Sequence, residues 1–109
     1  MKNFIANIFN LITRFFHAAF EASGYGLLLR NSFRGFPNSQ YELAEFYFLK
    51  EKNYIEAFAW AEVACARNHP KASALKQRIE EMLSPEISIN AHKKAEEYKR
   101  SFARRKSIR

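Results

Sequence analysis

Residues 43–72 read LAEFYFLKEKNYIEAFAWAEVACARNHPKA, and the pattern in this stretch decides the fold. Its apolar residues recur every three or four positions, as they do along one face of an α-helix. Polar residues 50–53 divide the stretch, and Asn53 followed by Glu56 three residues later is typical of a helix start. Asn68 suits the left-handed position that follows a helix. The stretch therefore predicts two consecutive helices joined by a short polar loop.

Small and large apolar residues alternate within these two predicted helices. Alanine at a helix crossing lets two backbones approach closely, while side chains such as Leu43, Tyr47 and Trp60 fill the space around it. A short polar loop also makes consecutive helices antiparallel. The predicted core positions are Leu43, Ala44, Phe46, Tyr47 and Leu49 in the first helix and Ile55, Ala57, Phe58, Trp60, Ala61, Ala64 and Cys65 in the second.

Two further helices are predicted after residue 68. Pro70 fits the first turn of a third helix that runs to about Leu83. Ser84, Pro85 and Glu86 supply an N-cap, a proline at the first helical position and an acid in the first turn of a fourth helix. Helical spacing predicts core positions at Ala72, Leu75, Ile79 and Met82 in the third helix and at Ile87, Ala91, Ala95, Tyr98 and Phe102 in the fourth.

The residues before the quoted stretch also read as helical. Ser39 with Glu42 matches a capping box, which predicts that the helix carrying Leu43 starts there. Residues 24–38 predict a short helix between two turns, with the leucines at 27–29 in the core. Gly24 itself suits the left-handed cap of a preceding helix.

That preceding helix, over residues 4–20, is amphipathic with a wide apolar face. Its polar residues recur at alternating spacings of four and three, so they fall on one line along the helix. These polar interruptions argue against a spanning helix and against a secretory signal. We expect the apolar face to pack within the protein or its oligomer, with a partner's groove or a membrane surface as the alternatives. The residues that would enter such a groove or membrane are Phe4, Phe9, Phe16 and Phe20.

The spacing of the small and aromatic residues in 39–72 has a counterpart in a known repeat. The positions that match are Leu43-Ala44, Tyr47, Ala57, Trp60, Ala64-Cys65, Asn68 and Ala72. On these positions the stretch resembles one repeat of the Sel-one-like repeat family, relatives of the tetratricopeptide repeats. The loop at 50–53 is shorter than in the family, and Asn53 stands where an Asp is usual. The resemblance implies protein–protein scaffolding, with closing helices after residue 83.

We therefore predict an all-α protein, a short solenoid-like stack of antiparallel helical hairpins with an amphipathic N-terminal helix. Residues 1–38 would form the N-terminal helix and connector, residues 39–83 the repeat helices, and residues 84–109 the closing helix with a basic tail. One repeat alone is rarely stable, so the N-terminal helix or a second copy would cover its exposed side.

No combination of residues in the sequence predicts a reaction. The three histidines are isolated, and each pair of adjacent glutamates, at 80–81 and 96–97, points to different sides of a helix. The 11 acidic residues are all glutamate, and there is no glycine-rich phosphate loop. The single Cys65 excludes an internal disulfide. We therefore expect a protein that is not an enzyme and has no metal site and no cofactor.

The charge is concentrated at the C-terminal end. The whole chain carries a net charge of +7, and residues 93–109 hold eight basic residues against two acidic ones, a local net charge of +6. Such a tail is either a solvated helix end or a handle for an acidic partner, a membrane surface or, less favoured, nucleic acid. The basic residues proposed for such contacts are Lys99, Arg100, Arg104, Arg105 and Lys106.

The function that these observations favour is a small non-catalytic protein-interaction module, acting as an adaptor or accessory subunit. Its partner would be another protein, with homo-oligomer formation as a further option, and its expected location is cytoplasmic, with peripheral membrane association as the alternative. The groove edged by the repeat helices is the expected contact surface. Its candidate exposed aromatic residues are Tyr41, Phe48 and Tyr54.

Overall fold

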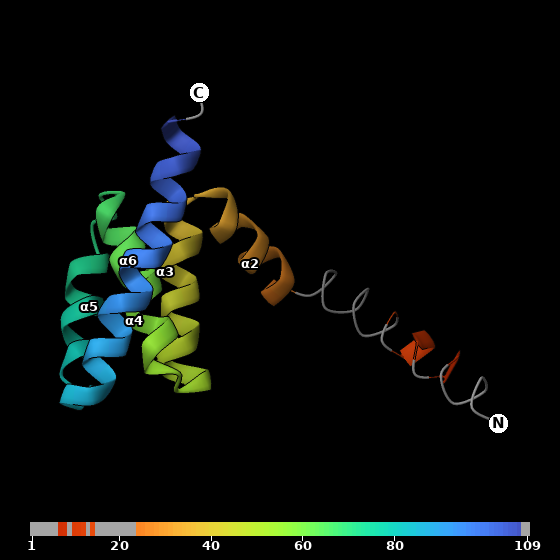
Figure 1. Cartoon of the computed structure of the whole chain (residues 1–109), viewed down its shortest axis with the longest axis horizontal. Helices are drawn as coiled ribbons and strands as arrows, with labels where there is room; N and C mark the ends of the chain where they lie inside the picture. The colour runs from red at the N-terminus through yellow and green to blue at the C-terminus, as the bar shows by residue number, and fades with distance from the viewer. Residues whose placement is uncertain (1–6, 9, 13, 15–23, 108–109) are drawn as a thin grey trace.

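The structure, a computed structural model, describes residues 7, 8, 10–12, 14 and 24–107, the last four of these by their backbone only. The described part of the chain is helical and contains no strand, which confirms the all-α class (Figure 1). In chain order its elements are α2 (Gly24–Arg34), α3 (Pro37–Phe46), the π-helix η1 (Tyr47–Glu51), α4 (Tyr54–Ala66), α5 (Ala72–Glu80) and α6 (Pro85–Ser107).

Helix α4 is the centre of the fold. It packs against α3, α5 and α6, while α2 packs against the other side of α3 (Figure 1). Helix α4 is predominantly apolar and is covered by three neighbouring helices, as expected of a central helix. Its buried side chains are Ala57, Phe58, Ala59, Trp60, Ala61, Val63 and Ala64. The neighbouring helices complete the core with Leu43, Ala44, Leu75, Ile79, Ala91, Ala95 and Phe102.

Three predicted helix boundaries are confirmed at the level of atoms. The Asn53 side chain accepts a hydrogen bond from the Glu56 amide at 3.2 Å and caps α4. Asn68 is left-handed, with φ of 66°. The Ser84 hydroxyl accepts from the Ile87 amide at 3.4 Å, immediately before α6. These features are fixed by short-range hydrogen bonds, which is why local sequence predicts them.

The start and end of the helix that carries Leu43 were predicted wrongly. Helix α3 begins at Pro37 with Phe36 as N-cap and no side-chain cap, so Ser39 lies inside the helix. Proline at the first position has its φ already set for a helix, and it starts α3 two residues before the expected capping box. At the other end the helix continues as η1 to Glu51, beyond the expected break at residue 50.

The π-helix explains why Leu49 is exposed, not buried. A π-turn contains one more residue than an α-turn, so it rotates the following side chains away from their α-helical face. Leu49 is 54% exposed as a result. The left-handed Lys52, with φ of 55°, then ends the helix and turns the chain toward α4.

Helix α5 is shorter than predicted at both ends. It begins at Ala72, because Pro70 lies in the turn before it, and it ends at Glu80. Met82 therefore falls outside the helix and is 54% exposed, contrary to its predicted place in the core. Ile87, in the first turn of α6, is also exposed. Both residues lie near the α5–α6 connection, where helical spacing no longer determines which side faces the core.

The short helix predicted before α3 is confirmed as α2, with different details. Gly24 is its first residue and not the cap of a preceding helix, and Leu27 is exposed while Leu28 and Leu29 are partly buried. Gly35, with φ of +98°, ends α2. Its amide donates to the Ser32 carbonyl, and the next amide donates to the Asn31 carbonyl, which is the hydrogen-bond pattern of a Schellman motif.

The described residues of the N-terminal helix are helical and exposed. Ile8, Leu11 and Ile12 are 43%, 71% and 47% exposed. Packing within this chain therefore does not account for these three apolar side chains. The four phenylalanines predicted to form the same face lie outside the described residues.

Candidate functional site

The structure places the predicted partner-binding aromatics on the outer side of α3, η1 and α4. Tyr41, Phe48 and Tyr54 are each half-buried, so they are less exposed than the sequence suggested. The Tyr41 ring stacks on His69, with ring centroids 4.4 Å apart. Phe48 and Tyr54 meet edge to face at 5.9 Å. The three residues therefore belong to a packed surface and do not project singly into solvent.

Arg78 on α5 lies near two of these residues, Phe48 and Tyr41. Its guanidinium carbon lies 5.5 Å from the centroid of the Phe48 ring, a cation–π contact. Partial burial, followed by the negative charge of Glu45, raises the pKa of the Tyr41 phenol, whereas the positive charge of Arg78 acts in the opposite direction. We call Tyr41, Phe48, Tyr54 and Arg78 the aromatic surface. It carries one cation beside two tyrosine rings and one phenylalanine ring, a composition found in protein contact sites.

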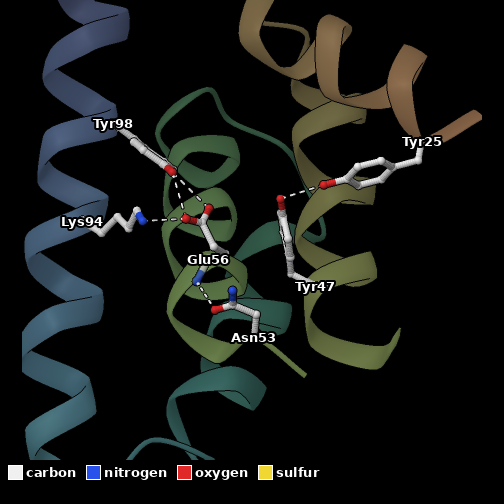
Figure 2. Close-up of polar contacts among 6 residues, drawn as sticks. All are labelled: Tyr25, Tyr47, Asn53, Glu56, Lys94 and Tyr98. Carbon is white, nitrogen blue, oxygen red and sulfur yellow. Dashed lines mark hydrogen bonds and ion pairs between the residues drawn. The ribbon is translucent and has the colours of Figure 1, made fainter. Parts of the chain in front are cut away.

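A polar cluster lies on another side of α4, around Glu56 (Figure 2). The Glu56 carboxylate accepts hydrogen bonds from the Tyr98 hydroxyl at 3.0 and 3.1 Å and pairs with the Lys94 ammonium at 2.7 Å. On the side toward α3, the hydroxyls of Tyr25 and Tyr47 share a hydrogen bond of 2.9 Å (Figure 2). The cluster links α4 to α6 and α2 to η1.

Two tyrosines of this cluster, Tyr47 and Tyr98, are held in the neutral form. Burial, followed by the hydrogen bond shared with Tyr25, raises the pKa of Tyr47 well above its usual range. Burial, followed by the charge of Glu56, does the same to the pKa of Tyr98. A phenol with a raised pKa donates a hydrogen bond but is a poor base or nucleophile at neutral pH. The cluster is therefore suited to holding helices together.

A second acidic residue of α4, Glu62, joins three helices. Its carboxylate pairs with Lys76 of α5 at 2.7 Å and with Lys99 of α6 at 3.1 Å. Lys99 also pairs with Glu96 at 2.8 Å. Burial raises the pKa of Glu62, but the hydrogen bonds from the two lysines outweigh it, so the net pKa of the carboxyl is lowered. From the sequence, Glu56 was singled out only as part of the helix start at Asn53, and Glu62 was not singled out at all. An acid within an otherwise apolar helix is the signal that could have found both contacts.

Side chains with metal or redox chemistry do not gather in the described part of the chain. Among those residues no group of three or more His, Cys or Glu could hold a metal ion. His92 lies over Phe58, with its Nδ1 atom 2.8 Å from the Ser88 carbonyl oxygen. His69 Nδ1 accepts from the Lys71 amide at 3.1 Å. The Nδ1 atom of each histidine therefore contacts a backbone group that is close in sequence.

The basic residues of α6 are in part neutralised. Lys94 and Lys99 each pair with a glutamate of α4, whereas Arg100 is exposed. Arg104, Arg105 and Lys106 belong to α6, and their side chains lie outside the described residues. Tyr98 and Phe102 pack on Trp60, with ring centroids 5.0 and 6.1 Å from it, as their alignment with the apolar face predicted.

The comparisons with known proteins found no match: no family model, no curated protein and no solved structure corresponds to this chain. Within the described residues, no helix combines the length and apolarity needed to cross a membrane.

Proposed function

We propose that this chain is a non-catalytic protein-interaction module, an adaptor or accessory subunit whose helices stack as antiparallel hairpins in a short solenoid of the Sel-one-like type. The burial of Ala57, Trp60 and Ala64 supports this stacking, because these residues carry the resemblance to the repeat. The short connections between α3 and α6 also support it, since they favour antiparallel neighbours.

The observation that carries the proposal is the aromatic surface. Its three rings come from the consecutive elements α3, η1 and α4, yet each keeps part of its area open to solvent. Rings that are already packed lose little conformational freedom when a partner binds, so they contribute binding energy at low entropic cost. A partner would cover Tyr41, Phe48 and Tyr54 and face Arg78, which lies beside Phe48.

Affinity capture from native cells with quantitative mass spectrometry tests the proposal. Replacing Tyr41, Phe48 and Tyr54 with Ala should remove specific partners from the captured set. Arg78→Glu reverses a charge on an exposed side chain and leaves all three rings in place, so it serves where the triple variant unfolds. Ile89→Ala, at a site 70% exposed on α6, is the control. If a folded triple variant and Arg78→Glu both capture the unchanged set, the aromatic surface is not the contact site.

A second candidate function is peripheral membrane association through the N-terminal helix. It is favoured by the exposure of Ile8, Leu11 and Ile12, which are apolar and lie within one turn and a half of the helix. An amphipathic helix binds a bilayer interface in proportion to the apolar area it buries there.

Flotation with vesicles of phosphatidylcholine and phosphatidylserine tests this alternative. The full chain should float with the vesicles, and deletion of residues 1–23 should abolish flotation. Replacing Ile8, Leu11 and Ile12 with Ser should weaken it strongly, whereas Asn10→Ser, on the polar line, should not. A full chain that stays at the bottom of the gradient with these vesicles would remove the membrane hypothesis.

A further inference from the structure

A small open pocket lies between the end of α4 and the second half of α6. Its volume is about 150 Å³, enough for a carboxylate and one or two methylene groups. Two of its lining residues are cations and the others are apolar. They are Val63, Ala66, Arg67, Lys99, Phe102 and Ala103.

Arg67 is held in place at this pocket by packing. Its guanidinium carbon lies 5.4 Å from the centroid of the Phe102 ring. On the other side is Gly35, where an added Cβ would come within 3.1 Å of a guanidinium nitrogen. The glycine therefore makes room for the arginine. Within the described part of the chain no acidic side chain pairs with Arg67, so its donors are available to a ligand.

The other charges near the pocket balance one another almost completely. Lys99 pairs with Glu62 and Glu96, and Glu62 also pairs with Lys76. Together with Arg67 this makes three cations against two carboxylates, a net charge of +1. The uncompensated charge is that of Arg67.

We infer that this pocket binds a single carboxylate, from an acidic side chain of a partner protein. The planar guanidinium of Arg67 can donate two parallel hydrogen bonds to one carboxylate, and Val63 and Phe102 can cover the methylene groups behind it. This inference rests on the proposed function, because it takes the partner to be a protein. The residues that line the pocket differ from those of the aromatic surface, so the two sites can be tested separately.

The same observations disfavour nucleic acid as the occupant. Strands of nucleic acid are bound by several phosphate contacts and by bases stacked on open aromatic rings. Among the described side chains at the pocket one positive charge is left unpaired, and Phe102 is buried beneath Arg67. Phosphate and carboxylate are both oxyanions, so the experiment must distinguish them.

Titration followed by nuclear magnetic resonance tests the inference on the full chain. The probes are acetyl-Gly-Glu-Gly-amide, the matching Gln peptide and inorganic phosphate, at constant ionic strength. The Glu peptide should shift the Arg67 side-chain Nε–H resonance saturably, and the Gln peptide should not. Arg67→Gln should weaken Glu-peptide binding about tenfold or more, the effect of losing charge-assisted hydrogen bonds. Arg78→Gln, which removes the same charge elsewhere, should leave this binding unchanged.

Each other outcome of the titration has a definite meaning. If the Glu peptide causes no saturable shift, or if phosphate binds as tightly as the peptide, the assignment to a partner's carboxylate is overturned. Arg67→Lys keeps the charge and loses the paired donors, so it should also weaken binding and serves if Arg67→Gln unfolds. The proposed function is tested by a different result: it fails if the variants of the aromatic surface capture the same set of proteins as the wild type. The pocket could still bind the Glu peptide in that case, so the two failures are distinguishable.

Discussion

The two sides of α3 differ in how completely their apolar residues are covered. On the core side, formed by α4, α5 and α6, seven of the 13 residues of α4 are buried. On the N-terminal side, α2 buries only Gly26 and Ser32 of its 11 residues, and Leu27 is 52% exposed. Phe36, in the connection from α2 to α3, is 54% exposed. We infer from this difference that the side chains packed around α4 contribute most of the free energy of unfolding.

The covering of the core side also has a polar component, which is more extensive than the one described between α2 and α3. Glu56 and Glu62 tie α4 to α5 and α6 through three lysines and a tyrosine. Across α2 and α3, the buried Gln40 side chain donates to the Ser32 carbonyl, and its own carbonyl oxygen has no described partner. An unpaired buried acceptor costs free energy, so this interface is the weaker of the two.

The largest effect is expected at the centre of the core side. Trp60 is 1% exposed and contacts Phe33, Tyr98 and Phe102. Trp60→Ala should lower the free energy of unfolding by about 3–5 kcal/mol, through lost burial and the cavity left behind. Urea denaturation followed by circular dichroism measures it. A loss below about 1 kcal/mol would contradict the view that α4 holds most of the stability.

A smaller effect is expected at Gly35, where the two sides meet. Gly35→Ala should cost about 1–2 kcal/mol, because a side chain at φ of +98° is strained and would press on Arg67. The same denaturation experiment measures it. Gly24→Ala is the matched control, since an added Cβ there meets nothing within 4 Å. Equal effects of the two substitutions would show that the left-handed turn contributes nothing specific.

Glu62 provides a test of the core side that depends on pH. Glu62→Gln should lower the free energy of unfolding by about 1 kcal/mol at neutral pH, because two lysines lose a charged acceptor. The pKa of Glu62 is lowered by folding, so its stabilisation is present above the ordinary pKa of 4.5 and is lost as pH falls through the lowered value. The difference between wild type and variant should therefore shrink in acid.

Urea denaturation at a series of pH values measures this difference. Glu96→Gln is the control, because Glu96 is 56% exposed and its pairing with Lys99 within one helix should be worth only a few tenths of a kcal/mol. A difference for Glu62→Gln that grew as pH fell would contradict the sign derived from the lowered pKa.

The smallest effect is expected on the N-terminal side. Leu27→Ala should change the free energy of unfolding by no more than about 0.5 kcal/mol, since the side chain is already 52% exposed. Thermal unfolding of the two proteins in parallel provides the measurement. A loss as large as that of a buried leucine would mean that Leu27 is covered in solution, and the contrast between the two sides would then disappear.

The helices and most of their caps were predictable because they depend on neighbours in sequence. Asn53, Asn68 and Ser84 act on residues within three or four positions, and the apolar spacing of α4 is visible without any partner. The π-helix was not predictable in this way. Its register results from how η1 packs, and it moved Leu49 out of the core.

The candidate sites were only partly predictable. The sequence indicated Tyr41, Phe48 and Tyr54 as aromatic candidates, but their half-burial and their link to Arg78 depend on α5 packing beside α3 and η1. The pocket at Arg67 was missed entirely. It lies between the end of α4 and α6, and Gly35 makes room for its arginine; Gly35, Arg67 and Lys99 are successively 32 residues apart along the chain.

The order of apolar, small and capping residues was enough to determine that this chain forms helices, since hydrophobic spacing and caps are local properties. The tertiary structure alone decided which charges are neutralised. Glu56 and Glu62 take their partners from α5 and α6, and Arg67 is left with a ring and a glycine instead of an acid. Charges pair according to distance in space, and that distance is fixed only when the helices have packed.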